Sequence, residues 1–369
     1  MPRVAVIFPP LELSRDFIDY PYFADLGALQ AAALLRARGH DVQLLDALAS
    51  PGAELVPLRG DELRIGAPLE PARIAASGPS VVIVAYTPFH RPPHRQALLA
   101  GLLMGLREAL PSTPIVLADL YQSGQHVVDA PAEAILEAYP EVDLLLRYEA
   151  EGSLPALVDA LCAEGRPAAA RVVYGVELES LDELPPPAWD LVDLDAYWGL
   201  HERLVQDLGR HRWAFPIDGR ALPMITSRGC PYRCTHCSSN PGTPAGEPKR
   251  QRRHSRESLA RHLDWLVSLG ARRIHLLDEL ANVHQRHFDA LLELLRDRDL
   301  RFEIPNGVRA DHVEAHHLGA MRGRLTTLSV SAESGSQRVV DEVVGKSLDL
   351  SAIHAVCERA QRAGIDTLV

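Results

Sequence analysis

The chain has 369 residues, of which 47% are hydrophobic and 24% are charged, and its formal net charge is −11 at pH 7. This composition is that of a globular protein long enough for two domains of ordinary size. The acidic balance argues against nucleic acid as a partner, because nucleic-acid binders usually carry a basic face. The longest apolar runs are too short to span a bilayer, and the N-terminus has no cleavable signal pattern. We therefore expect a cytoplasmic protein without a membrane span.

The first half of the sequence alternates strand patterns with helix patterns. Strand-like runs occur at 4–8, 41–46, 80–86, 114–119 and 142–149. Helices are expected at 26–39, at about 95–110 and at 153–163. This alternation predicts an α/β domain with a doubly wound parallel sheet, the type of sheet that binds ligands beyond the carboxyl ends of its strands.

A proline-rich stretch separates the two halves. The sequence ELPPPAWDLVDLDAYWGL at 183–200 has three prolines followed by scattered aromatic residues, which is typical of a stiff, extended connector. We place the first domain at 1–170, the connector at 171–221 and the second domain at 222–369.

The second half alternates again. Strands are expected at 222–227, 273–279, 301–307 and 325–334, and helices near 255–269, 284–298, 310–321 and 350–363. GIDTLV, at 364–369, begins a further strand. A basic run, KRQRRHSR at 249–256, precedes the first of these helices, and a short charge run of this kind is usually a solvated loop.

Three of the five cysteines, Cys230, Cys234 and Cys237, lie within eight positions directly after a predicted strand. So few cysteines, most of them clustered, indicate a metal in a reducing compartment rather than a disulfide framework. A structural zinc site needs four nitrogen or sulfur ligands, which His236 and His254 could complete. A four-iron cluster normally uses four thiolates, so three leave one iron open for an exogenous ligand. The spacing favours the cluster, with zinc as the lesser alternative.

The CxxxCxxC spacing after a barrel strand resembles the signature of radical S-adenosylmethionine (SAM) enzymes. The resemblance implies that the three cysteines hold a [4Fe–4S] cluster whose open iron binds the methionine part of SAM. It also implies reductive cleavage of SAM to a 5′-deoxyadenosyl radical, with His236 near the adenine. The other positions that resemble SAM contacts of the family follow successive barrel strands, where barrel sites collect; they are Asp278, Glu279, Asn306, Arg309, Ser331 and Glu333.

The first domain, its connector and the cysteine motif together resemble the cobalamin-binding class of radical SAM enzymes. The stretch LLLRYEAEGSLPALVDAL at 144–161 is similar to the usual end of that cobalamin domain. The resemblance implies cobalamin as a further cofactor, and the expected loop contacts are Thr87, Tyr121, Gln122 and Glu149. The DxHxxG motif, whose histidine binds cobalt in many cobalamin proteins, is missing. His90, His94 and His126 lack its context, so we expect them to be surface loop residues.

The resemblance implies a cobalamin-dependent radical SAM enzyme that methylates carbon, or rearranges by radical chemistry, a small-molecule substrate. A flavodoxin or ferredoxin is the expected reductant. A methylthiotransferase is disfavoured, because such enzymes carry three more cysteines in the first domain and this one has only Cys162. A non-catalytic or degenerate cofactor-binding protein is the alternative from another class.

The family barrel has six parallel strands, whereas this sequence gives four complete ones and the start of a fifth. We therefore expect a partial TIM-type barrel truncated at the start of strand 5. The chain is then either a fragment or is completed by another chain, since an open sheet edge is a liability that proteins cover or close.

Overall fold

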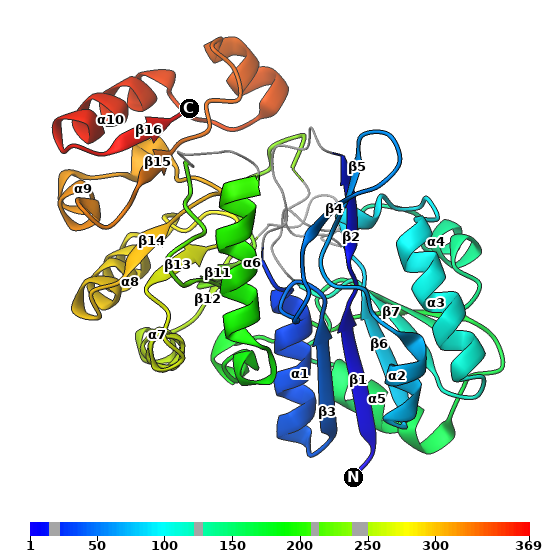
Figure 1. Ribbon diagram of the computed structural model, residues 1–369. Coiled ribbons are helices and arrows are strands. Elements are labelled where there is room, and N and C mark those ends of the chain that lie inside the picture. Colours follow the sequence, from blue (N-terminus) through cyan, green and yellow to red (C-terminus); the bar gives the residue numbers. More distant parts are fainter. Residues whose placement is uncertain (15–22, 122–127, 208–213, 238–249) are drawn as a thin grey trace. The chain divides into compact units, whose positions relative to one another are not determined.

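The computed structural model describes residues 1–14, 23–121, 128–207, 214–237 and 250–369 (Figure 1). The chain divides into two compact units, one formed mainly by residues 1–208 and the other mainly by residues 209–369. The short segment Glu179–Asp182 belongs to the second unit. Within the described ranges, no helix is long and apolar enough to cross a membrane.

The first unit is built on a six-stranded parallel sheet with the order β3-β1-β6-β7-β8-β9. The strands are β1 (Arg3–Phe8), β3 (Asp41–Asp46), β6 (Val81–Ala85), β7 (Ile115–Ala118), β8 (Leu144–Arg147) and β9 (Arg171–Tyr174). The strand order reverses at β1, so the carboxyl ends of β1 and β6 flank a switch point where such sheets bind ligands. The predicted α/β fold with a parallel sheet is confirmed, and β9 adds a strand that the sequence did not indicate.

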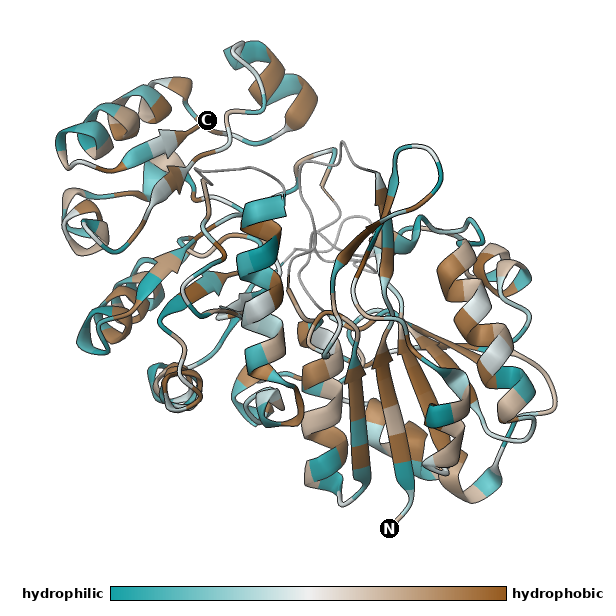
Figure 2. Cartoon of the chain, in the orientation of Figure 1, coloured by the Kyte–Doolittle hydropathy of each residue, from teal (hydrophilic) through white to brown (hydrophobic). Residues whose placement is uncertain are grey.

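Helices cover both faces of this sheet, which explains why its central strands β1, β6 and β7 are apolar at almost every position. Helices α2 (Pro71–Ala76), α3 (Ala97–Ala109) and α4 (Ala132–Ala138) share a core with one face. Helices α1 (Leu26–Arg38) and α5 (Leu154–Glu164) pack together on the other. In Figure 2 the strands of this sheet are mostly hydrophobic, and the helices beside them carry both hydrophobic and hydrophilic residues. The predicted end of α1 is confirmed, because Gly39 adopts the left-handed conformation, with φ of 101°.

The proline-rich segment is more structured than an extended connector. Besides β9, it contains the short helices η2 (Leu181–Glu183) and η3 (Trp189–Leu191) and the helix α6 (Leu194–Asp207). The Gln30 amide donates to the Pro185 carbonyl over 2.9 Å, and the Ala188 N–H donates to Leu29. The prolines lack N–H donors, so the neighbouring residues make the hydrogen bonds that bind this segment to α1.

A small antiparallel sheet completes the first unit. It consists of β2 (Leu11–Ser14), β5 (Glu62–Ile65) and β4 (Leu55–Pro57), in that order. The short helix η1 (Pro88–His90) follows β6. The sequence pattern predicts neither the small sheet nor the short helices α2, α4 and η1.

The second unit repeats strand and helix around a curved parallel sheet. Its strands are β10 (Ala221–Met224), β13 (Arg273–Leu276), β14 (Arg301–Glu303), β15 (Thr327–Ser329) and β16 (Asp366–Leu368). Parallel pairing joins β10 to β13, β13 to β14 and β15 to β16. Parallel bridges from Phe302 to Leu325 and from Val308 to Val330 join the third to the fourth strand. The described residues therefore contain five strands in chain order, and the last is the one that GIDTLV was expected to begin.

The helices between these strands are α7 (Arg256–Ser268), α8 (Gln285–Asp297), α9 (Ala315–Met321) and α10 (Leu350–Arg362), with the short η4 (Ala310–His312) before α9. All four longer helices agree with the predicted ranges to within a few residues. Two further elements adjoin the cysteine motif. One is an antiparallel hairpin of β11 (Ser227–Arg228) and β12 (Arg252–Arg253), and the other is a π-helix, η5 (Val339–Val344).

Candidate cofactor site

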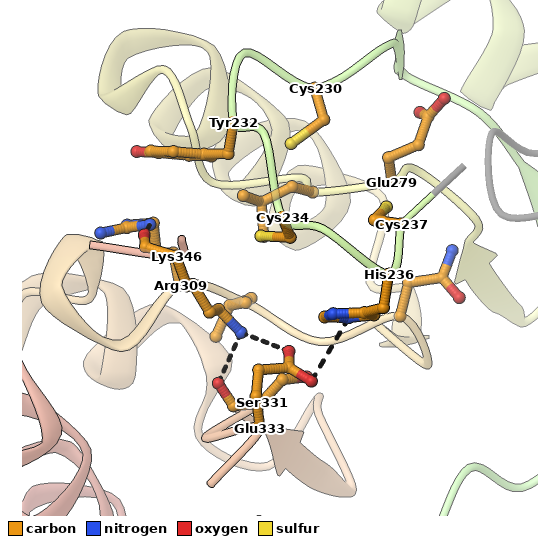
Figure 3. Close-up of a pocket in the computed structure, with 13 residues that line it drawn as sticks. Cys230, Tyr232, Cys234, His236, Cys237, Glu279, Arg309, Ser331, Glu333 and Lys346 are labelled. Carbon is orange, nitrogen blue, oxygen red and sulfur yellow. Dashed lines mark hydrogen bonds and ion pairs between the residues drawn. The ribbon is translucent and has the colours of Figure 1, made fainter. Parts of the chain in front are cut away.

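A cavity in the second unit brings the cysteine motif together with the carboxyl ends of three successive strands (Figure 3). Nine predicted site residues line it: Cys230, Cys234, His236, Cys237, Glu279, Asn306, Arg309, Ser331 and Glu333. Four residues that the sequence analysis did not single out also line it: Tyr232, Leu280, Val308 and Lys346. Residues far apart in the sequence thus meet where the strands end, as a barrel requires.

The cysteine loop is fixed at both ends. Gly229, at φ of 86°, turns the chain out of β11, and its N–H donates to the Glu279 carboxylate over 3.0 Å. A tight turn brings the N–H of Cys237 to 3.1 Å from the Cys234 carbonyl. Between these two cysteines, Thr235 donates from its N–H to Val344 and from its hydroxyl to Val343, each over 2.9 Å. The loop is therefore held against η5, a contact that no local sequence signal announced.

Two of the three cysteine thiols have raised pKa values, so a metal that binds them must displace their protons. Burial raises the pKa of Cys230 to about 11, and the neighbouring thiols of Cys237 and Cys234 and the Glu279 carboxylate add to the rise. Burial also raises the pKa of Cys234. Metal binding to such thiols releases protons and is strongly favoured by rising pH.

Zinc and an iron–sulfur cluster make different demands on the three cysteines. A structural zinc ion needs four nitrogen or sulfur ligands, whereas a four-iron cluster held by three thiolates keeps one iron open.

The two histidines expected as zinc ligands, His236 and His254, lie in different surroundings. His236 lines the cavity, whereas His254 is buried outside it and its Nδ1 lies 3.0 Å from the Ser258 hydroxyl. Burial lowers the pKa of His254 to about 3, and the nearby His262 adds to the effect. The suggestion that His254 completes a zinc site is not supported.

Lys346 is the central cation of the cavity. Its ammonium group donates to the Ser331 carbonyl over 2.6 Å and to the Glu333 carboxylate over 2.7 Å (Figure 3). The other carboxylate oxygen of Glu333 lies 3.5 Å from Nε2 of His236. Glu333 itself has a φ of 62°, a left-handed backbone conformation that is costly for a residue with a side chain. The ion pair with Lys346 stabilises this loop and presents charges of both signs to the cavity.

Arg309 lines the cavity but is occupied by protein contacts. Its guanidinium donates to the carbonyls of Lys346 and Ser347 over 3.0 Å and 2.6 Å, and it is paired with Asp311. It also lies 4.1 Å from the centre of the Tyr232 ring, in a cation–π contact. Arg309 thus fixes both the cysteine loop and the backbone of Lys346.

Asn306 and Asp278 support the cavity wall. The Asn306 amide donates to the carbonyls of Leu277 and Asp278. Asp278 is fully buried, does not line the cavity, and accepts hydrogen bonds from the hydroxyls of Thr226 and Ser227. Burial raises its pKa, and those hydrogen bonds oppose the rise. The structure therefore places Asp278 behind the site, where it anchors the strand that leads into the cysteine loop.

Lys346 and Tyr232 line the cavity but were not predicted as site residues. Tyr232 lies inside the cysteine motif, so its place near the cavity followed from the spacing alone. Lys346 follows η5 by two residues and reaches back to the preceding strand. A single lysine after a glycine is not a recognisable sequence motif. Its place in the cavity becomes visible only in the folded structure.

The predicted contacts of the first unit lie at the carboxyl ends of neighbouring strands. Thr87 follows β6, Tyr121 follows β7 and Glu149 follows β8. Thr87 and Glu149 are buried and Tyr121 is half-buried. Gln122 lies outside the described residues. The three described residues therefore share the edge where a doubly wound sheet binds ligands.

The expectation for the histidines of this unit needs one correction. His90 is fully buried rather than on the surface, and its Nδ1 accepts the N–H of Thr87 over 3.0 Å. Burial lowers the pKa of His90 to about 4, so the ring is neutral. His90 thus has a structural role, because its side chain caps the start of η1. His94 is exposed, as expected, and His126 lies outside the described residues.

Comparisons with known proteins agree with this geometry. The family model of the radical SAM superfamily matches residues 224–369, which contain the cysteine motif and all strands that line the cavity. Residues 224–369 therefore form a radical SAM domain. Its relatives include the anaerobic magnesium-protoporphyrin IX monomethyl ester cyclase of Synechocystis, 24% identical over 84% of this chain and 56% of the relative. An uncharacterized methyltransferase of Pyrococcus horikoshii is 23% identical over 99% of this chain and 72% of the relative.

Solved structures share the whole two-domain fold. The cobalamin-dependent SAM radical enzyme OxsB, with aqua-cobalamin bound, has a TM-score of 0.68 at 18% identity over 100% of this chain and 49% of its own. The radical SAM methyltransferase TsrM from Kitasatospora setae, with cobalamin and a [4Fe–4S] cluster bound, has a TM-score of 0.64 at 15% identity over 100% of this chain and 68% of its own. The predicted family is confirmed. The chain spans about half the length of the cyclase and of OxsB.

Proposed function

We propose that this chain binds a [4Fe–4S] cluster through Cys230, Cys234 and Cys237 and cleaves SAM reductively. When bound and reduced, such a cluster supplies the electron that converts SAM into a 5′-deoxyadenosyl radical. The observation that carries the proposal is one cavity lined by the three cysteines and by polar residues from three successive strand ends. Three thiolates leave one iron available to SAM, and a donor set of this size suits no closed structural site.

The residues of the cavity fit the two ends of SAM. The Lys346 ammonium has three donors, of which the structure assigns two, and its positive charge suits the methionine carboxylate. Glu333 and Ser331 suit an amino group or ribose hydroxyls. His236, about half exposed, lies where it can pack against the adenine. Arg309, Asn306 and Asp278 hold these groups in place through the contacts described above, which limits water access and movement.

We further propose cobalamin as the second cofactor, bound at the carboxyl edge of the first sheet by Thr87, Tyr121, Gln122 and Glu149. The support is the switch point between β1 and β6 and the fold shared with OxsB and TsrM. The sequence has no DxHxxG motif. A lower cobalt ligand other than a histidine of a DxHxxG motif, or none, follows from the proposal.

The reaction on the final substrate is proposed as methyl transfer to carbon of a small molecule. The methyltransferase relative and TsrM support this choice. The cyclase among the relatives supports the second candidate, a radical rearrangement or ring closure with the same cofactors. A flavodoxin or ferredoxin is proposed as the source of electrons, and a cytoplasmic site as the place of action.

The test is to reconstitute the chain anaerobically with iron and sulfide, reduce it, add SAM and measure 5′-deoxyadenosine. We expect product from the unaltered chain and none from Cys234→Ala, which keeps the fold but lacks one ligand. A fully loaded and reduced cluster that yields no 5′-deoxyadenosine would support the alternative, a non-catalytic cofactor-binding protein. Iron absent and zinc present after anaerobic purification would favour the zinc alternative instead.

A further inference from the structure

Two histidines and an aspartate from neighbouring helices of the second unit meet at one point, and none of the three lines the cavity. Helix α8 carries Asp289, and the first turn of α9 carries His316 and His317. The two helices pack against each other (Figure 1). Each of the three side chains offers one metal-ligating atom, and the three atoms lie within 4.8 Å of one another.

Both imidazoles meet the same carboxylate oxygen. Oδ1 of Asp289 lies 2.8 Å from Nε2 of His316 and 2.9 Å from Nε2 of His317. One such hydrogen bond would be enough to hold α8 against α9. Two imidazole nitrogens and a carboxylate oxygen at one point are instead the kind of ligand set that binds zinc and related divalent ions.

The spacing of these atoms is close to that of a metal site. Bonds of about 2.0–2.1 Å at tetrahedral angles would place neighbouring ligand atoms about 3.3 Å apart. The two distances to Asp289 must therefore lengthen by about 0.5 Å. His316 is exposed and Asp289 is half-buried, so both can rotate slightly. His317 is buried and its ring meets that of Phe288 edge-on, at 5.1 Å between centres, which holds one ligand in position.

A second carboxylate stands behind His316. The Nδ1 atom of His316 lies 3.5 Å from Oε2 of Glu314. A histidine that binds a metal through one ring nitrogen usually donates the N–H of the other to a carboxylate, a carbonyl or water, which fixes the ring. Glu314 is in place to accept this N–H, and its negative charge adds to that of Asp289 in attracting a cation.

His317 has to exchange one contact for the metal. Its Nδ1 accepts the N–H of Glu314 over 3.0 Å, so the neutral ring carries its proton on Nε2. Burial lowers the pKa of His317, which keeps the ring neutral. When a metal takes Nε2, the proton moves to Nδ1 through water, and the N–H of Glu314, an exposed residue, turns to solvent. No net proton is taken up or released at this ring, and the lost hydrogen bond limits the affinity.

We propose that Asp289, His316 and His317 bind one first-row divalent metal ion, zinc in particular, with water in the fourth position. The inference is independent of the proposed function, because the cysteine loop contributes no ligand. Magnesium and calcium are disfavoured, since they prefer oxygen ligands. The bound ion joins α8 to the start of α9, which η4 connects to Arg309 of the cavity.

The test measures zinc binding where the cysteine loop cannot contribute. The background is the full chain, without an affinity tag, in which all three loop cysteines are alanine. It also separates this site from the zinc alternative for the cysteine loop. Into this background we introduce His316→Ala or Asp289→Asn, and, as a matched control, His354→Ala, which removes another exposed histidine of the same unit, on α10. Zinc is titrated by calorimetry, with magnesium as the comparison ion.

We expect the background and the His354→Ala control to bind one zinc ion per chain. His316→Ala and Asp289→Asn should bind zinc at least tenfold more weakly, because each lacks one of three ligands. Zinc should raise the melting temperature of the background and the control but not of the two site variants. In protein labelled with ¹⁵N-histidine, nuclear magnetic resonance should show the ring proton of His317 moving from Nε2 to Nδ1 when zinc is added. Magnesium should cause none of these changes.

Equal zinc affinity in all four proteins, or no binding to the background, would overturn the proposal. The three side chains would then be only a polar contact between α8 and α9. Weaker binding in the site variants without any change at the His317 ring would overturn the three-ligand site as well. Circular dichroism shows whether each protein is folded. If the alanine background is not, the unaltered chain with alkylated thiols takes its place, and the same outcomes decide.

Discussion

The two parallel sheets of this chain bury different kinds of side chain. Strands β1, β6 and β7 of the first unit are apolar at almost every position, whereas β13 and β14 of the second unit bury Arg273, His275 and Glu303. The first sheet is covered by helices on both faces, so apolar burial stabilises it. The second sheet satisfies its buried polar groups by specific contacts: Arg273 pairs with Glu303, and His275 hydrogen-bonds the Pro216 carbonyl. Polar contacts in the second unit therefore carry both stability and chemistry.

The two candidate sites also differ in how clearly the sequence marks them. The site of the second unit is marked by a local motif, three cysteines within eight residues. The edge of the first unit is assembled from single residues that follow three different strands, and none of them belongs to a motif. A cluster site needs several ligands of one type, while a large organic cofactor can be held by scattered contacts and backbone groups.

The largest effect on the site of the second unit is expected when one proposed cluster ligand is removed. We expect Cys230→Ala, Cys234→Ala or Cys237→Ala to lose the cluster, its charge-transfer absorbance and all SAM cleavage, because three thiolates are the minimum for a cluster with one open iron. Cys357→Ala, on α10, should keep about four irons per chain. Retention of iron by all three ligand variants would refute the assignment.

The second test removes a buried polar contact from the second sheet. Arg273 on β13 is paired with Glu303 on β14, and the Thr326 hydroxyl donates to the same carboxylate over 2.7 Å. Arg273→Met leaves a buried carboxylate without its cation and should cost about 3–5 kcal/mol of unfolding free energy.

The matched variant replaces both partners. Arg273→Met/Glu303→Leu should be much closer to the unaltered chain, because it removes the buried charge as well as its partner. Urea unfolding measures both variants. If the double variant were as unstable as the single one, the loss of stability would not come from leaving the Glu303 charge unpaired.

The third test concerns Lys346. Lys346→Ala should weaken SAM binding about ten- to a hundredfold, since a charge-assisted hydrogen bond contributes about 1.5–3 kcal/mol. The loop of Glu333 should also lose its anchor. Lys346→Arg keeps the charge and should recover part of the affinity, measured by calorimetry on reconstituted protein. Unchanged affinity in the alanine variant would remove Lys346 from the site.

The smallest effect is expected in the first unit, from the buried Asp119. Burial raises the pKa of Asp119 to about 7, from 3.8. Because the folded-state pKa lies above the unfolded one, the protonated carboxyl favours folding at low pH, and this stability is lost as the pH rises through about 7. Between pH 6 and pH 8 the loss is about 1.4 kcal/mol.

Asp119→Asn removes this titration. The variant should show a flatter pH dependence and should be more stable than the unaltered chain at pH 8. Hydrogen exchange of the β6 and β7 amides, corrected for intrinsic rates, reports on this unit alone. An equal slope in both proteins would show that Asp119 does not titrate in this range.

The sequence predicted the repeating elements better than the contacts between them. Buried strands and the glycine that ends α1 are local patterns, so their ranges were right to within a few residues. The strand β9 and the helix α6 were missed, because prolines suggested an extended chain. Pairing with β8 fixes β9, and buried side chains such as Tyr197 and Leu204 fix α6. The π-helix η5 has no local signature either.

The same limit applies to the site. Nine of the predicted residues line the cavity, because the resemblance fixed their positions relative to strand ends. Asp278 and Glu279 are neighbours in the sequence, yet the strand turns only Glu279 toward the cavity. Lys346 was missed since its approach depends on η5 and on Arg309 binding its carbonyl. The position of such a residue depends on tertiary contacts, which the local sequence does not reveal.

The central claim is that three thiolates leave one iron open to SAM. Electron paramagnetic resonance of the reduced, reconstituted chain, recorded with and without SAM, tests it most directly. We predict a signal of a reduced [4Fe–4S] cluster whose shape changes when SAM is added, because the added groups bind the open iron. A fully reduced cluster whose signal is the same with saturating SAM would mean that the fourth iron already has a protein ligand, and it would contradict the account.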